Sequence, residues 1–76
     1  MGNFFSKEID GKQFNFQPIE FGDQTGYHID VKDEQGIRWE FRALFKNEKW
    51  NIEGEDLPTW IYGTQNLLIK AIDDHD

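Results

Sequence analysis

The sequence contains no cysteine, and this absence excludes several kinds of chemistry at once. Without cysteine there are no disulfide bonds, no thiolate metal ligands and no cysteine nucleophile. Small secreted domains commonly depend on disulfide bonds for their stability, whereas proteins of reducing compartments do not. We therefore expect a cytoplasmic protein.

Long apolar runs and basic residues are also scarce. No apolar run approaches the roughly 18 residues that suggest a membrane-spanning helix, so we expect no membrane association. The chain carries 15 acidic residues against 8 basic residues, which gives a net charge of −7. Because phosphate groups repel an acidic surface, we expect no direct binding to nucleic acid.

Recognisable catalytic motifs are absent as well. His28 and His75 are far apart in the sequence and do not have the spacing of a metal site. No serine or threonine has the context of a nucleophile elbow, and the glycines form no phosphate-binding loop. We therefore expect that the protein is not an enzyme and needs no cofactor or metal.

Aromatic residues, in contrast, are abundant, at 16% of the 76 residues. A single domain of this length buries only about 60% of the surface that its unfolded chain exposes, so each large ring matters for stability. In the segment 36–52, GIRWEFRALFKNEKWNI, every second residue is apolar at first: Ile37, Trp39, Phe41, Ala43 and Phe45. This period of two is typical of a half-buried strand.

Turn signals divide the first 55 residues into strands. Asp10-Gly11 predicts a two-residue hairpin, and Gly36 predicts a three-residue hairpin. The apolar pattern then places Phe5 opposite Phe16, Val31 opposite Trp39, Ile29 opposite Phe41, Phe45 opposite Trp50 and Ala43 opposite Ile52. We expect one domain over residues 1–76, with antiparallel strands at about 3–9, 12–21, 26–33, 36–46 and 49–55.

Two features of the strand region need separate comment. Pro18 cannot donate to a ladder of hydrogen bonds, and the apolar phase changes beside it. We therefore expect a β-bulge near Gln17-Pro18. The pattern does not decide whether the first hairpin joins the main sheet or swaps between chains.

From residue 57 the period changes to that of an amphipathic helix, which we expect over about 57–72. Asp56 is the expected N-cap, and Pro58 belongs in the first turn. Gly63 suggests a kink or a close packing contact. The acidic residues after Ile72 oppose the helix dipole, so we expect fraying there. The fold class is therefore α+β: a curled five-stranded antiparallel meander with one C-terminal helix on its apolar face.

The expected sheet is about 20 Å wide, whereas one helix is about 10 Å across. The helix covers the apolar face only if the sheet curls around it. The rings of that face are then either plain core or, in part, an open groove or self-association surface. Leu44 and Ile69, which point away from their expected buried sides, favour the second interpretation. Trp39, Trp50 and Trp60 are the candidate anchors.

The opposite face of the sheet carries a predicted row of carboxylates. The register places Asp30 opposite Glu40 and Glu40 opposite Glu55. Because like charges on neighbouring strands repel, such a row could attract a divalent cation or the lysines of a partner. The simpler interpretation is that the residues Arg38, Arg42 and Lys32 neutralise the row diagonally.

These observations favour a small acidic, non-enzymatic protein-interaction domain that binds a protein partner or forms a homodimer. The candidate partner-binding residues are Trp39, Trp50, Trp60, Asp30, Glu40 and Glu55. One alternative is a binder of a small apolar ligand held between sheet and helix, which requires a pocket of about 300 Å³. Another is an acidic inhibitor or nucleic-acid mimic that uses the carboxylate row and the acidic C-terminal residues.

Overall fold

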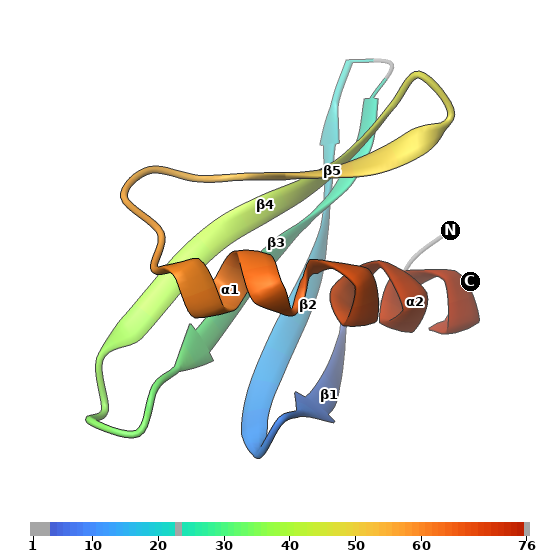
Figure 1. The fold of residues 1–76 in the computed structure, drawn as a ribbon. Helices are drawn as coiled ribbons and strands as arrows, with labels where there is room; N and C mark the ends of the chain where they lie inside the picture. The colour runs from blue at the N-terminus through green and yellow to red at the C-terminus, as the bar shows by residue number, and fades with distance from the viewer. Residues whose placement is uncertain (1–3, 23, 76) are drawn as a thin grey trace.

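Five antiparallel strands form one sheet, and two short helices lie across one of its faces (Figure 1). The computed structural model describes residues 4–22 and 24–75. The elements follow one another along the chain as β1 (Phe5–Ile9), β2 (Lys12–Phe21), β3 (Gln24–Lys32), β4 (Arg38–Lys46), β5 (Lys49–Glu53), α1 (Thr59–Gly63) and α2 (Gln65–His75). Each strand pairs with its sequence neighbours in the order β1-β2-β3-β4-β5. The first hairpin therefore belongs to the main sheet.

The turns have the chemistry that the sequence predicts. Asp10 and Gly11 have φ angles of 53° and 77°, as a tight two-residue hairpin requires. Asn47 and Glu48 adopt φ angles of 52° and 65° and form a second turn of the same length. Gly36, with a φ of 82°, closes the predicted three-residue hairpin. All five predicted cross-strand residue pairs are confirmed.

The predicted bulge at Pro18 is wrong. The β2–β3 register runs without interruption from Phe14–Val31 to Phe21–Gln24, with Pro18 opposite Tyr27. Alternate residues of a strand point their N–H groups to the same side. In β2 the N–H groups on the β1 side are those of Lys12, Phe14 and Phe16, and the nitrogen of Pro18 is the next on that side. The last described pair between β1 and β2 is Phe5–Phe16. The nitrogen of Pro18 thus faces away from β3, and no β2–β3 hydrogen bond is lost.

The single predicted helix is two helices. Asp56 has a φ of 53° and lies outside the helix, and α1 begins after Pro58 rather than at a carboxylate cap. The break falls at Thr64, whose Oγ1 donates to the Ile61 carbonyl oxygen at 2.8 Å. A hydroxyl that bonds the preceding turn competes with the helical pattern. Open space surrounds the position of a Cβ at Gly63, so no close contact there causes the break.

The C-terminal helix is longer than predicted. It continues to His75 instead of ending near Ile72. Lys70 Nζ lies 3.6 Å from Asp74 Oδ2, an i,i+4 ion pair on the last turns. Such a pair contributes about 0.2–0.5 kcal/mol to a helix, which offsets part of the unfavourable interaction between the acidic residues and the dipole.

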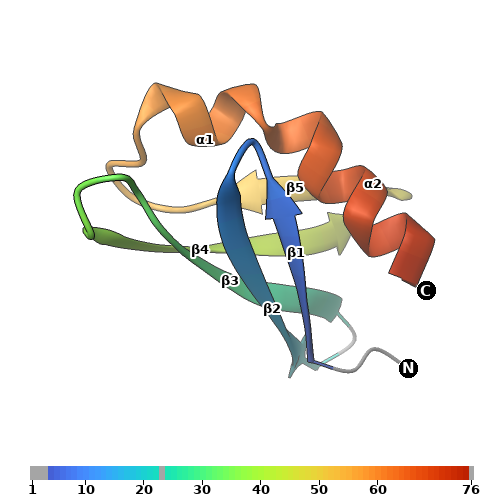
Figure 2. The same ribbon diagram turned by 90° about the horizontal axis from the view of Figure 1, so that it is seen from below.

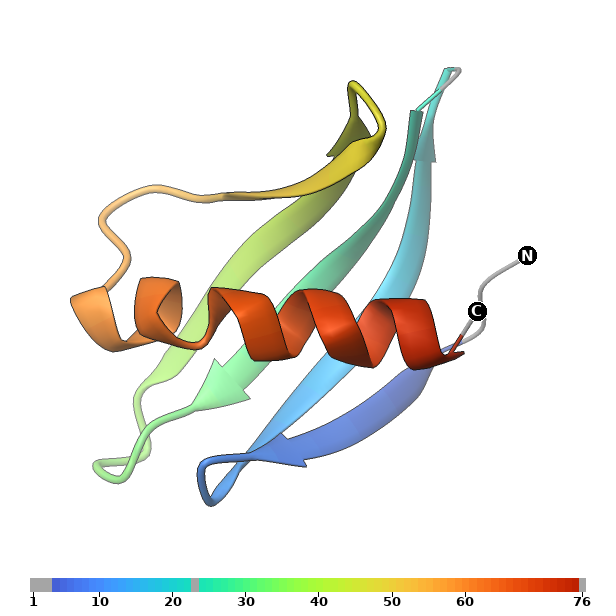
Figure 3. The ribbon, with the colours of Figure 1, turned by 45° about the vertical axis from the view of Figure 1, so that its right-hand side comes forward.

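The core lies between the helices and the sheet (Figure 2). It is built from side chains of the sheet and of both helices that are essentially inaccessible to solvent: Phe14, Phe16, Tyr27, Ile29, Val31, Ile61, Leu68 and Ile72. The helices run across the strands and cover the sheet only in part, because the β4–β5 hairpin extends beyond them (Figure 3). The sheet is open, and β1 and β5 are its two edges.

Leu44 lies on the face of the sheet opposite the helices, yet its exposed fraction is only 5%. Its pairing partners on this face are Gly26 and Asn51. A Cβ built on Gly26 would lie 2.7 Å from Leu44 Cδ2 and 3.6 Å from an Ile19 carbon. The absence of a side chain at Gly26 therefore creates the space that Leu44 fills, and this explains why an apolar residue is out of phase.

We expect opposite effects from alanine at two glycines. Gly26→Ala should destabilise the protein by about 1–3 kcal/mol, because its Cβ would lie 2.7 Å from both the Ala43 carbonyl oxygen and Leu44. Gly63→Ala should stabilise it by up to about 1 kcal/mol, because a helical glycine with open space gains from a side chain. Urea denaturation measures both. A Gly26→Ala variant as stable as the wild type would contradict this account of Leu44.

Candidate functional site

The three tryptophans occupy different parts of the rim of the core. All three are partly buried and pack against the core. Trp39 donates from Nε1 to Asp33 Oδ2 at 3.2 Å, near the β3–β4 turn. Trp60 lies on α1 with its ring 6.4 Å from that of Phe14, and Lys12 Nζ lies 4.9 Å from the centre of the Trp60 ring. Trp39 and Trp60 thus lie beside polar or charged partners of their own chain, Asp33 and Lys12.

Trp50 is placed differently, because it lies on the edge strand β5. Its ring is 5.9 Å from Tyr27 and 5.3 Å from Phe45. Phe45 is 43% exposed although it belongs to the apolar face, because the helices do not extend over this end of the sheet. Ile52 also points to this face and is half-buried. We call Phe45, Trp50 and Ile52 the β5 corner.

The backbone of β5 has polar groups that face outward. Lys46 and Lys49 flank the two-residue turn and therefore form a hydrogen-bonded pair. Because such pairs alternate along an antiparallel ladder, Asn51 and Glu53 also bond to β4. The N–H and C=O groups of Trp50 and Ile52 then point away from the sheet, to a side where no described strand lies. The β5 corner thus combines apolar side chains with available backbone donors and acceptors.

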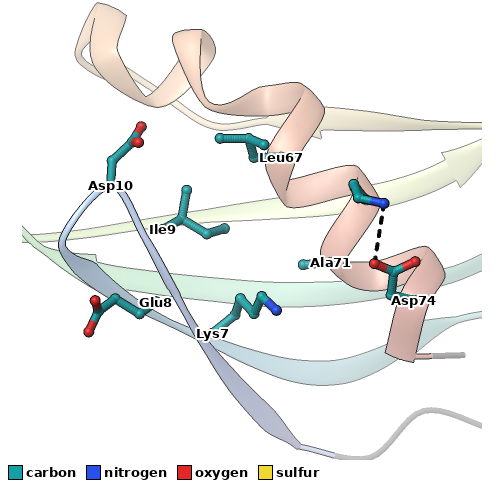
Figure 4. Close-up of a pocket in the computed structure, with 8 residues that line it drawn as sticks. Lys7, Glu8, Ile9, Asp10, Leu67, Ala71 and Asp74 are labelled. Carbon is teal, nitrogen blue, oxygen red and sulfur yellow. Dashed lines mark ion pairs between the residues drawn. The ribbon is translucent and has the colours of Figure 1, made fainter.

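The other edge, β1, is protected. A groove of about 280 Å³ lies between β1 and α2, and Ile9, Leu67 and Ala71 form its apolar part (Figure 4). Charged residues surround this part: Lys7, Glu8, Asp10, Lys70 and Asp74. Lys7 occupies the centre of β1 on the helix-facing side. An inward-pointing lysine on a short edge strand is a common way in which proteins prevent edge-to-edge pairing.

The predicted carboxylate row is formed only in part. Asp30 and Glu40 are paired residues on neighbouring strands, as predicted. The predicted pair of Glu40 with Glu55 does not form in the ladder, because β5 ends at Glu53 and Glu55 lies in the loop that follows. Glu55 still lines a shallow hollow of about 280 Å³ together with Glu40 and His28.

Cations of the same face neutralise the two paired carboxylates. Arg38 Nε lies 3.0 Å from Asp30 Oδ2, and its guanidinium also lies 3.8 Å from Glu40. This confirms the role expected of Arg38. His28 Nε2 lies 3.0 Å from Glu40 Oε1, a contact that the sequence pattern did not predict. The signal was available, because His28 is paired with Arg42 and is therefore a diagonal neighbour of Glu40.

The described residues contain no group of three or more histidine or acidic side chains arranged to hold a metal ion.

Two carboxylates of the sheet region, those of Asp33 and Glu53, have lowered pKa values. The hydrogen bond from Lys46 at 2.7 Å lowers the pKa of Glu53, and the charges of Lys46 and Arg42 lower it further, against partial desolvation. Glu53 therefore stays ionised beside the β5 edge.

Asp33 fixes both a turn and Trp39. Partial desolvation raises the pKa of Asp33, but the hydrogen bonds from Ile37 N–H, Trp39 Nε1 and Gln35 N–H, with the charge of Lys12, together outweigh it and lower the pKa. The distances are 2.9 Å to each backbone nitrogen and 3.2 Å to the indole nitrogen. The ionised carboxylate therefore holds the β3–β4 hairpin and one tryptophan in place.

We expect Asp33→Asn to destabilise the protein at pH 7 and to lose this effect in acid. A carboxylate with a lowered pKa contributes stability above its unfolded pKa of about 3.9, and this contribution is lost as the pH falls through the folded pKa. Urea denaturation of both proteins from pH 7 to pH 2 measures the difference, which should shrink below about pH 4. Glu34→Gln, at the exposed neighbouring position, is the control. A difference that is constant with pH would contradict the assignment.

No helix in the described residues is long and apolar enough to cross a membrane. Comparison of the chain with protein-family models, with curated proteins and with solved structures found no match. A functional proposal therefore depends on the geometry of the chain's own surface, where the β5 corner places an exposed ring beside outward backbone groups.

Proposed function

We propose that this chain is a non-enzymatic protein-interaction domain that binds an extended peptide segment along the free edge of β5. The observation that carries the proposal is the outward backbone of Trp50 and Ile52 beside the exposed ring of Phe45. Addition of a strand to an exposed sheet edge is a recurring mode of peptide recognition. The main-chain hydrogen bonds supply affinity, and the alternating side chains supply specificity.

The side chains around the edge define the chemistry of the bound segment. On the helix-facing side, Trp50 and Ile52 would lie opposite every second residue of the segment, and pairs of apolar or aromatic residues contribute about 0.2–1 kcal/mol each. On the other side, Lys49, Asn51 and Glu53 offer charged and polar partners. The segment therefore alternates apolar and polar residues and lacks proline at the positions that donate to β5.

Of the three tryptophans that the sequence analysis named as candidate anchors, only Trp50 belongs to the proposed binding edge. Trp39 and Trp60 contribute to the stability of the domain through their contacts with Asp33 and Phe14. The acidic-mimic alternative is weaker, because Arg38 already lies 3.0 Å from Asp30 and 3.8 Å from Glu40. The apolar-ligand alternative is weaker too, because the groove at the sheet–helix boundary has a charged rim. The cysteine-free composition is consistent with a cytoplasmic location, and the net charge of −7 with a partner other than nucleic acid.

The test uses random nine-residue peptides selected for binding to the intact protein. Selected peptides should shift the amide resonances of Trp50 and Ile52. Ile52→Pro removes an outward N–H without removing a bond to β4, and we expect binding about tenfold weaker. Phe45→Ser, which changes an exposed ring, should weaken binding as well.

Glu8→Pro is the matched control on the opposite edge. Ile9 and Lys12 flank the first two-residue turn, so Glu8 also points its N–H outward, from β1. This variant should bind the selected peptides as the wild type does. Selected peptides that shift the β1–α2 groove instead, or that bind Ile52→Pro and the wild type equally, would refute the proposal. Circular dichroism confirms that each variant is folded.

A further inference from the structure

We infer that a second copy of this chain occupies the β5 edge, in a two-fold antiparallel β5–β5 pair with Asn51 at the axis. The inference rests on the proposed function, because it uses the same edge. It arises from the sequence of β5, Lys49-Trp50-Asn51-Ile52-Glu53, read against its own reverse. The result would be one continuous ten-stranded sheet, formed from two sheets of five strands.

The backbone phase permits this register. With Asn51 opposite Asn51 of the second copy, Trp50 lies opposite Ile52 of the second copy, and the reverse pair also forms. Trp50 and Ile52 are the residues whose N–H and C=O groups point outward. Both pairs therefore meet as hydrogen-bonded pairs, and Asn51 meets its equivalent as a non-hydrogen-bonded pair. No change in the conformation of β5 is needed.

The side chains agree with the backbone. Lys49 lies opposite Glu53 of the second copy at both ends of the pair, so each end joins opposite charges. Glu53 already accepts a hydrogen bond from Lys46 of its own chain at 2.7 Å, so Lys49 of the second copy would add a second cation beside an ionised carboxylate. Trp50 opposite Ile52 is an aromatic–β-branched pair, a favourable kind of cross-strand neighbour. Four of the five residues of β5 thus meet a complementary side chain in this register, and Asn51 meets its own equivalent at the axis.

Neighbouring registers fit less well. A shift that places Trp50 opposite Trp50 would put Ile52 opposite Glu48 of the turn, and a shift that centres on Ile52 would put Trp50 opposite Gly54. The equivalent central pairing of the other edge would place Lys7 of β1 opposite Lys7, and like charges at opposed positions are destabilising. The like-charge pair of Lys7 therefore disfavours the β1 edge, and the apolar pairs favour one register of β5.

The dimer should be weak. A pair of five-residue strands is a small interface, of the size found in transient complexes. The net charge of −7 on each copy also opposes association, although salt screens exposed charges beyond about 10 Å at 0.1 M. We expect a dissociation constant on the order of 0.1 mM, measured by sedimentation equilibrium at several protein concentrations in about 0.1–0.2 M salt.

Cysteine cross-linking tests the register, since the natural chain has no cysteine. In the proposed dimer the Asn51 Cα atoms lie about 4.5 Å apart, within the range that a disulfide spans. Asn51→Cys should therefore form a covalent dimer in a buffer of oxidised and reduced glutathione. Lys49→Cys is the matched control on the same strand and face. Its two Cα atoms would be about 13 Å apart, which is too far for a disulfide.

A second substitution tests the charges. Lys49→Glu introduced into the Asn51→Cys variant places a glutamate opposite Glu53 and should lower the yield of covalent dimer at least threefold. Covalent dimer from Asn51→Cys with little from Lys49→Cys supports the inference. Equal yields from both variants would overturn it, as would an Asn51→Cys variant whose thiol reacts with a thiol reagent but forms no dimer. A chain that stays monomeric but still binds the selected peptides through β5 overturns the dimer and leaves the proposed function standing.

Discussion

The length of the turn at Asn47 and Glu48 is the constraint on which the surface of this protein depends. Because the turn has two residues, Lys46 and Lys49 must be a hydrogen-bonded pair, and the phase of every later residue in β5 follows. A turn longer by one residue would reverse the inward and outward side chains of β5. Trp50 and Ile52 would then face the polar side of the sheet, and the apolar corner would not exist.

Most of the sheet could be predicted because its signals are local. Asp10-Gly11 and Gly36 identify their turns, and the period of two then gives the register with Phe16, Trp39 and Ile52 in their observed places. The bulge at Pro18 was a wrong prediction because the cost of a proline depends on which neighbour its nitrogen faces, and a pattern along one strand does not contain that information. Thr64 was missed because a hydroxyl bond to the preceding turn has no periodic signature.

The candidate site was harder to predict than the fold. The sequence shows which residues are aromatic, but it does not show which part of the sheet the helices leave uncovered. The sequence alone does not distinguish Trp39 and Trp60 from Trp50. In the structure, Trp39 donates a hydrogen bond to Asp33 and Trp60 packs on Phe14. The position of Glu55 depends on how far β5 continues, and the ends of strands carry the weakest sequence signals. The contrast between the protected β1 and the open β5 becomes visible only when both edges are compared.

The packing of Leu44 affects which part of this small protein unfolds first in transient local unfolding. It fits against Gly26 on the face that the helices do not touch, so β3 and β4 are joined by apolar packing from both sides at this point. The ion pair between Lys46 and Glu53 joins β4 to β5 diagonally across the pair of Leu44 and Asn51. When the helical layer detaches transiently, the pairing of these strands does not depend on the helices alone. The packing of Leu44 and the ion pair thus protect the amide protons around Leu44 independently of the helices. These protons should exchange with solvent more slowly than those at the helix ends.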